Sequence, residues 1–127
     1  MSLIGIISSE NELNIIIEEE FDQFPADDYI LRIPSDEEAI LEFLNFDLPE
    51  IVIINFADKN LSLGEILSQI QDDSWLHNFG IIGIFDHEYQ NEEDVLAQYQ
   101  NLNILAMLDR PRLRSHIVRC AQIIEQN

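Results

Sequence analysis

The sequence predicts an α/β fold built on a five-stranded parallel sheet, and two observations carry that prediction. Five short apolar runs alternate with segments in which apolar residues recur every three or four positions, as in repeated strand and helix units. The run at residues 51–54 is Ile-Val-Ile-Ile, between Pro49 and a polar loop at 57–60, which is typical of a strand buried on both faces of a sheet. Right-handed crossovers between such strands place helices on both faces.

The first strand and helix are expected near the start of the chain. Residues 3–7 are apolar and read as a buried strand. Ser9 and Glu12 have the spacing of a capping box, which predicts that a helix begins there. The apolar positions that follow at helical spacing are Leu13, Ile16, Ile17, Phe21 and Phe24.

The second unit contains the most polar strand. Residues 29–33 include Arg32 and end at Pro34, which suits the edge of a sheet better than its centre. Ser35 and Glu38 form a second capping box and predict the start of the next helix. With this strand at an edge, the expected strand order is 2-1-3-4-5, doubly wound.

The remaining units follow the central strand. Helices are expected at 63–70, around 95–99 and from Pro111 onward, and strands at 80–85 and 104–108. The last helix has one apolar stripe, formed by Leu113, Ile117, Cys120, Ala121 and Ile124. Four residues on adjacent strands are expected in the core: Ile6, Ile53, Ile82 and Leu105.

Length and charge narrow the function classes. One domain over residues 1–127 is expected at this length. The formal net charge is -19, and 24 of the 25 acids precede residue 110, whereas four of the six bases lie at residue 110 or beyond. Phosphate contacts need clustered positive charge over a sizeable face, so neither nucleic acid nor a membrane is expected as a partner. A single Cys120, no leader pattern and apolar runs far shorter than the roughly 20 residues that span a bilayer favour the cytoplasm.

Polar side chains follow several strands at the edge of the sheet where ligands bind in folds of this class. In the expected order strands 1 and 3 are neighbours, so the loops after them meet. The residues expected to line this cleft are Ser8, Ser9, Glu10, Asn55 and Asp58, joined by Phe85 and Arg110.

The central strand resembles the one that carries the phosphoacceptor aspartate in two-component receiver domains, which have the flavodoxin-like (βα)5 fold. The matching residues are 49–55, Pro-Glu-Ile-Val-Ile-Ile-Asn. Three further framework matches are similar to receiver motifs: Glu-Ile-Leu at 65–67, Trp-Leu at 75–76 and Leu-Asp-Arg-Pro at 108–111. The resemblance covers the whole chain and implies a signalling domain that binds proteins.

The active-site positions depart from that resemblance one by one. Asn55 stands where the acceptor aspartate belongs, Ser8 and Ser9 where paired metal-binding acids belong, Phe85 where a small hydroxyl residue belongs, and Arg110 in place of the lysine. Phosphoryl transfer to a carboxylate needs an anionic nucleophile and a Mg²⁺ held by several carboxylates. The resemblance therefore implies a pseudo-receiver: no enzyme, no cofactor, no metal, and signalling that is independent of phosphorylation.

Other sites are disfavoured by their ligand sets. Asp58, three residues beyond the acceptor position, lacks supporting acids and is a poor candidate for a displaced acceptor. The acidic loop at 86–88, Asp-His-Glu, is interpreted as solvated. One alternative stays open: a small-ligand-binding domain or enzyme of the same fold that uses Ser8, Ser9, Asn55 and Arg110, since arginine recognises carboxylates and phosphates.

The expected partner is a protein. Arg112, His116, Arg119 and Ile123 form a stripe beside the apolar stripe of the last helix. Receivers often dimerise through helix 4, strand 5 and helix 5, and the resemblance carries this face to the present chain, where a homodimer would set acids against arginines. The expected interaction face comprises Glu92, Glu93, Asp94, Met107, Arg112, His116, Arg119 and Ile123.

Overall fold

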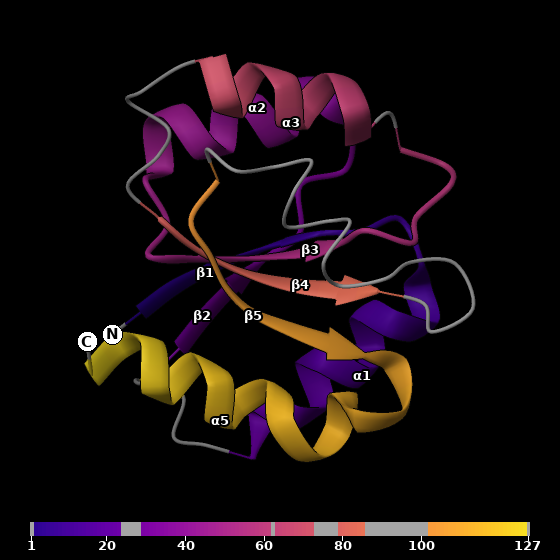
Figure 1. Cartoon of the computed structure of the whole chain (residues 1–127), viewed down its shortest axis with the longest axis vertical. Coiled ribbons are helices and arrows are strands. Elements are labelled where there is room, and N and C mark those ends of the chain that lie inside the picture. The colour runs from indigo at the N-terminus through magenta and orange to yellow at the C-terminus, as the bar shows by residue number, and fades with distance from the viewer. Residues whose placement is uncertain (1, 24–28, 62, 73–78, 86–101, 127) are drawn as a thin grey trace.

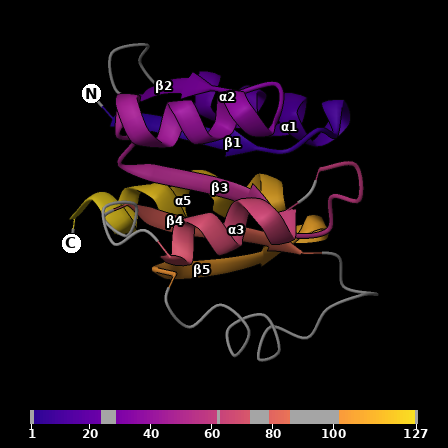
Figure 2. The ribbon, with the colours of Figure 1, turned by 90° about the horizontal axis from the view of Figure 1, so that it is seen from above.

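The computed structural model describes residues 2–23, 29–61, 63–72, 79–85 and 102–126. Its sheet has five strands, all paired in parallel, in the order β2-β1-β3-β4-β5. Figure 2 shows the strands side by side in this order. The strands are β1 (Ser2–Ile7), β2 (Tyr29–Arg32), β3 (Ile51–Asn55), β4 (Gly80–Phe85) and β5 (Ile104–Asp109). The predicted fold class and strand order are confirmed, with the polar strand at an edge.

Helices cover both faces of the sheet (Figure 1). One face carries α2 (Glu37–Glu42) and α3 (Leu63–Asp72), and the other carries α1 (Asn11–Asp22) and α5 (Leu113–Gln126). A π-helical turn at Phe43–Asp47 continues α2, and a 3-10 turn at Arg110–Arg112 leads into α5. The helix expected around 95–99 lies outside the described residues. Within the described part of the chain, no helix is long and apolar enough to cross a bilayer.

The core has two halves, one on each face of the sheet. Val52, Ile54 and Phe56 belong to the half under α2 and α3, whereas Ile51 and Ile53 belong to the half under α1 and α5. Side chains alternate along a strand, so Asn55 points toward the α1 and α5 face. All five residues of β3 are buried, which makes β3 the centre of the fold as expected.

The expectation that Leu105 is buried is wrong, while Ile6, Ile53 and Ile82 are fully buried. The side chain of Leu105 is 51% exposed. Strand β5 forms the second edge of the sheet, and its register shifts so that Ile81 pairs with Ile104 and the next residue, Ile82, pairs with Ala106. Leu105 is the extra residue at this bulge, and bulges of this kind re-aim a side chain.

Both predicted capping boxes are also wrong. Glu10 is the N-cap of α1 and makes no side-chain capping bond. The Ser9 hydroxyl instead donates to Asp58 in the loop after the neighbouring strand β3. The N-cap of α2 is Asp36, whose carboxylate accepts a hydrogen bond from the Ala39 amide at 2.8 Å. A serine followed by an aspartate left two possible caps, and the stronger acceptor occupies the position.

Candidate functional site

The loops after β1 and β3 meet at the carboxyl end of the sheet. Ile7 pairs with Ile54, so Ser8 and Asn55 are neighbours just beyond them, and both are buried. The Asn55 side-chain NH₂ donates to Ser8 Oγ over 3.3 Å, and its carbonyl oxygen accepts from the Ala57 amide over 3.1 Å. Asn55 is therefore held on both sides by bonds within the chain.

Asp58 bridges the two loops. Its Oδ2 accepts from the Ser9 amide at 2.5 Å, and the Ser9 hydroxyl lies 2.8 Å from each carboxylate oxygen. Its Oδ1 also accepts from the Asn60 amide at 2.9 Å. We call this set of bonds the Asp58 latch. It ties the loop after β3 to the start of the loop before α1, and both oxygens of the carboxylate take part.

The latch sets the pKa of Asp58. Burial by itself raises the pKa of this carboxyl, but hydrogen bonds from the Ser9 amide, the Asn60 amide and the Ser9 hydroxyl outweigh burial. The net result is a pKa below the ordinary value of 3.8. Asp58 is therefore an anion at neutral pH, and its charge is met by donors of the same chain.

A second contact closes the cleft from the β5 side. Arg110, in the 3-10 turn, forms an ion pair with Glu10 at the start of α1. Arg110 and Glu10 are thus brought together as the sequence predicted, yet they neutralise each other. An anionic ligand would have to compete with Glu10 for the guanidinium.

Two of the predicted residues, Phe85 and Met107, lie on β4 and β5, and Met107 packs against the core half under α2 and α3. Phe85 is half-buried at the end of β4, in register with Asp109. Met107 packs inward, because a Cβ added to Gly83 would lie 2.5 Å from its sulfur and 2.7 Å from the ring of Phe56. Gly83 is needed there for this close approach.

Asn14 is a contributor to the site that the sequence analysis missed. This buried residue of α1 donates from its side-chain NH₂ to the Ser8 carbonyl at 3.0 Å. Asn14, Ile17 and Phe21 follow one another at spacings of three and four, so Asn14 lies on the buried stripe of the helix. The sequence signal that could have identified Asn14 is a polar residue on an otherwise apolar helix stripe.

The residues present do not fit the Mg²⁺ of active receivers. Mg²⁺ takes oxygen ligands in octahedral geometry and relies on carboxylates. Here Ser8, Ser9 and Asn55 are neutral, Asp58 is engaged by the latch and Glu10 by Arg110. Among the described residues, no three His, Cys, Asp or Glu side chains come together as a metal site.

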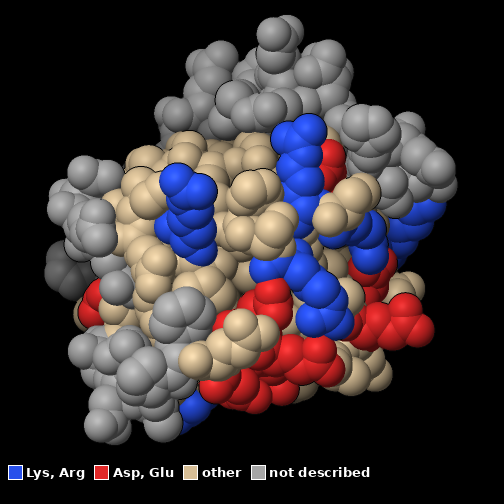
Figure 3. Space-filling model, turned by 90° about the horizontal axis from the view of Figure 1, so that it is seen from below, with Lys and Arg blue, Asp and Glu red and all other residues tan. Residues whose placement is uncertain are grey.

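The expected interaction face is described only in part. The 3-10 turn and α5 carry, in order, Arg112, His116, Arg119 and Ile123. Met107 lies inward on β5. The described residues do not include Glu92, Glu93 and Asp94. Arg112 and Arg119 are exposed, and His116 is half-buried. Figure 3 views the α1 and α5 side of the molecule, where basic side chains gather next to a cluster of acids.

Part of that basic charge is neutralised within the chain. Arg112 Nε lies 3.8 Å from Asp109. Arg114 bridges to α1, with Nη2 3.1 Å from Glu19 and Nη1 3.8 Å from Glu20. In the described part of the chain, Arg119 forms no ion pair.

Comparison with known proteins finds similar structures but no match to the sequence. No family model and no curated protein matches the sequence. Among solved structures, a two-component response regulator from Legionella pneumophila is similar over 100% of both chains, with a TM-score of 0.79 and 15% identity. The response regulator domain of Thermotoga maritima CheB is similar over 99% of this chain and 95% of its own, with a TM-score of 0.71 and 13% identity.

A third structure extends the comparison. A response regulator receiver modulated diguanylate cyclase from Pelobacter carbinolicus is similar over 99% of this chain and 93% of its own, with a TM-score of 0.69 and 17% identity. All three identities are low, so what the likeness shows is architecture. The chain has the fold of response-regulator receiver domains.

Proposed function

We propose that residues 1–127 form one receiver-like module that signals through protein contacts, without phosphorylation and without enzymatic activity. The observation that carries this proposal is Asn55, buried at the end of β3 with its side-chain amide bonded to Ser8 on one side and to the Ala57 amide on the other. An amide oxygen is a poor nucleophile, and an accepted phosphoryl group would need a metal and an anion there.

Asp58 does not replace the missing acceptor. Both of its oxygens accept hydrogen bonds in the latch, and these bonds stabilise the carboxylate and lower its pKa. Attack on a phosphoryl donor would require breaking these bonds and holding Mg²⁺ in a cleft whose other carboxylate, Glu10, is paired with Arg110. The latch therefore supports a structural role for this residue.

The alternative of a small ligand in the cleft has less support. The main argument for this alternative was Arg110, but Arg110 forms an ion pair with Glu10. A thermal-shift screen with phosphates and carboxylic acids is expected to leave the melting temperature unchanged. A compound at a hundred times its dissociation constant would stabilise the fold by about 2.7 kcal/mol and would favour this alternative.

The test of the proposal is intact mass after incubation with acetyl phosphate and Mg²⁺. We expect no gain of roughly 80 Da, the mass of a phosphoryl group, in the chain or in Asn55→Asp. Asn55→Asp restores the acceptor but leaves Ser8 and Ser9 neutral, so the metal ligands are still missing. An active receiver domain treated in parallel controls for the reagent. An adduct that disappears in Asp58→Asn would contradict the proposal.

We also propose that the stripe of Arg112, His116, Arg119 and Ile123 is a protein-binding face, with a second copy as one candidate partner. Arg119 supports this, being exposed and without an ion pair in the described part of the chain. Sedimentation at rising concentration tests self-association, and Arg112→Glu with Arg119→Glu is expected to split any dimer. A monomer at every concentration would leave an acidic protein as the partner of this face.

A further inference from the structure

A second surface, on the opposite edge of the sheet, exposes apolar side chains. Phe46 is 80% exposed, Leu48 56% and Ile33 36%. Phe46 and Leu48 come from the π-helical turn and the residue after it, and Ile33 follows β2. We call Arg32, Ile33, Phe46, Asp47 and Leu48 the β2-edge surface.

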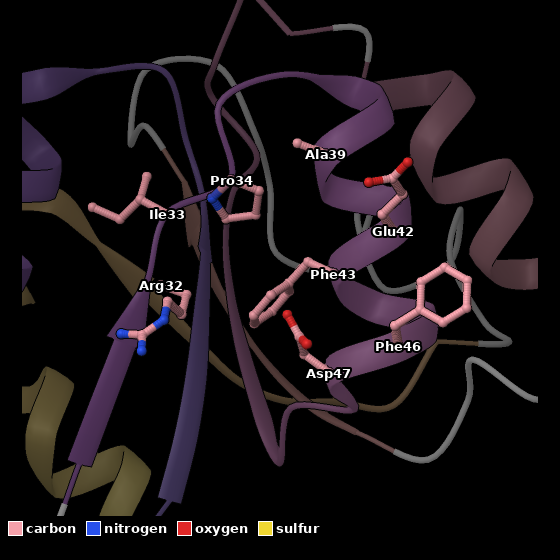
Figure 4. A pocket seen from close by; sticks show the side chains of 8 residues that line it. All are labelled: Arg32, Ile33, Pro34, Ala39, Glu42, Phe43, Phe46 and Asp47. Carbon is pink, nitrogen blue, oxygen red and sulfur yellow. The ribbon is translucent and has the colours of Figure 1, made fainter.

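This surface is hollowed rather than flat. A hollow of about 370 Å³ lies between the end of β2 and α2, lined by Ile33, Phe43 and Phe46 among others (Figure 4). A neighbouring hollow is lined by Leu3, Ile30 and Leu48 and shares Arg32 and Asp47 with the first. The shared residues make the two hollows parts of one continuous surface, large enough for several side chains of a partner.

The backbone that builds this surface is irregular. Phe43 points toward the strands, where its ring fills the space above Gly5 (Figure 4). Three residues later Phe46 points away from them. Leu48 ends the turn with a φ of 49°, in the left-handed region that disfavours leucine. Its side chain is mostly exposed, so burial of Leu48 does not compensate for the strain. Backbone strain and π-helical turns are both common at functional sites.

Charge decides what kind of partner fits. A third hollow lies beside these two, on α2. The acidic residues that line the three hollows are Glu37, Glu38, Glu42, Asp47 and Glu50. Among the described residues, Arg32 is the one base that lines any of the three hollows. A second copy that paired through this same surface would bring acids against acids, which is repulsive. A partner that buries the apolar side chains must therefore be positively charged around its own apolar residues.

We propose that the β2-edge surface binds a protein segment in which apolar side chains are flanked by lysine or arginine. The segment inserts an apolar side chain beside Phe46 and sets its basic side chains against Glu42 and Asp47. Burial of exposed apolar area supplies affinity, and the acidic rim supplies specificity. This inference rests on the proposal that the chain is an interaction module, but not on the chemistry of the cleft.

The test is a titration of the ¹⁵N-labelled chain with three amphipathic peptides of about 18 residues, or five helical turns. All carry the same leucine face, and their polar faces are lysine, glutamine or glutamate. We expect the lysine peptide to shift the amides of residues 32, 33 and 42–48 with saturation, the glutamine peptide to shift these amides only weakly, and the glutamate peptide to shift none.

Phe46→Ser and Ile15→Ser form a matched pair of variants. Ile15, on α1, is 53% exposed beside acids of its own helix but lines none of the three hollows. We expect Phe46→Ser to weaken the lysine peptide by about tenfold and Ile15→Ser to change it less than twofold. Circular dichroism checks that both variants are folded.

Three outcomes would overturn the inference. Equal effects of the two variants, or shifts spread over all acidic surfaces, would mean that the peptide binds by charge alone. Shifts at residues 42–48 on concentrating the chain by itself would mean that a second copy occupies the surface. A phosphoryl adduct in the mass experiment would contradict the proposed cleft chemistry and leave this surface untouched, so the two failures are distinguishable.

Discussion

The cleft at the carboxyl end of the sheet and the β2-edge surface differ in how their side chains are satisfied. In the cleft, Asn55, Asp58 and Glu10 find hydrogen-bond or ionic partners inside the chain. On the β2-edge surface, Phe46 and Leu48 stand exposed. A site whose polar groups bond to one another within the chain holds neighbouring loops of the fold together. The free energy of the system falls when a partner covers apolar area that a surface leaves in water.

The largest expected effect tests the strand beneath the cleft. Ile53→Ala should lower the free energy of unfolding by about 2 to 5 kcal/mol, because a fully buried side chain is replaced by a cavity. The matched control is Leu105→Ala on the edge strand, expected to cost less than about 1 kcal/mol because Leu105 is half-exposed. Urea denaturation measures both. Equal costs would mean that β3 is not the centre of the core.

The next effect tests the latch. Asp58→Ala should lower the free energy of unfolding by about 1 to 3 kcal/mol, because the Ser9 and Asn60 amides lose the charged acceptor that the buried Asp58 supplies. Asp36→Ala, which removes an exposed cap of α2, is a control expected near 1 kcal/mol. A fully neutral Asp58→Ala would mean that the loops are held together without the latch.

The latch also predicts a pH dependence. The folded-state pKa of Asp58 is depressed, so its contribution to stability is complete above the unfolded-state value of about 3.9 and is lost as the pH falls through the folded pKa. Below about pH 4 the wild-type chain should therefore lose stability more steeply than Asp58→Asn. Chemical denaturation of both proteins between about pH 6 and 3 makes the comparison. Parallel curves would contradict this role.

The smallest effects are expected on the β2-edge surface. Phe46→Ser should change the free energy of unfolding by less than about 0.5 kcal/mol, since the ring is exposed. Leu48→Gly should stabilise the fold by up to about 1 kcal/mol, because relief of the left-handed strain exceeds the entropy cost of glycine. Thermal melts measure both variants. A large loss in either would show that the surface is structural.

The fold was predictable because the central strand and an edge strand each have a recognisable sequence pattern. An unbroken β-branched run at 51–54 indicates a strand buried on both faces, and Arg32 before Pro34 indicates an edge. Leu105 was misplaced because a register shift leaves no trace in hydrophobic periodicity. The strands therefore follow from local pattern, whereas the bulge depends on how β5 meets β4.

The sequence predicted that several polar residues of the site lie together, but it missed Asn14 and did not predict the bonds between them. The strand order brings Ser8 beside Asn55, and Arg110 toward Glu10. The sequence predicted a capping role for Ser9, in which its hydroxyl accepts from a helix amide, yet the hydroxyl donates to the Asp58 carboxylate, 49 residues away, in a charge-assisted hydrogen bond. The strain at Leu48 was equally hidden, since leucine gives no sign of a positive φ. Long-range partners of short polar side chains have no local signature.

The most direct test of the closed cleft is an amide NMR titration with Mg²⁺ and beryllium fluoride, a mimic of the phosphoryl group. We expect no saturable shift at Ser9, Asn55 or Asp58, because their polar groups are already bonded within the chain. Mg²⁺ that gathers around so acidic a surface would cause only diffuse, salt-sensitive shifts. Saturable shifts at these three amides that require both Mg²⁺ and beryllium fluoride would show that the cleft binds a phosphoryl group and its metal, and that it is not closed.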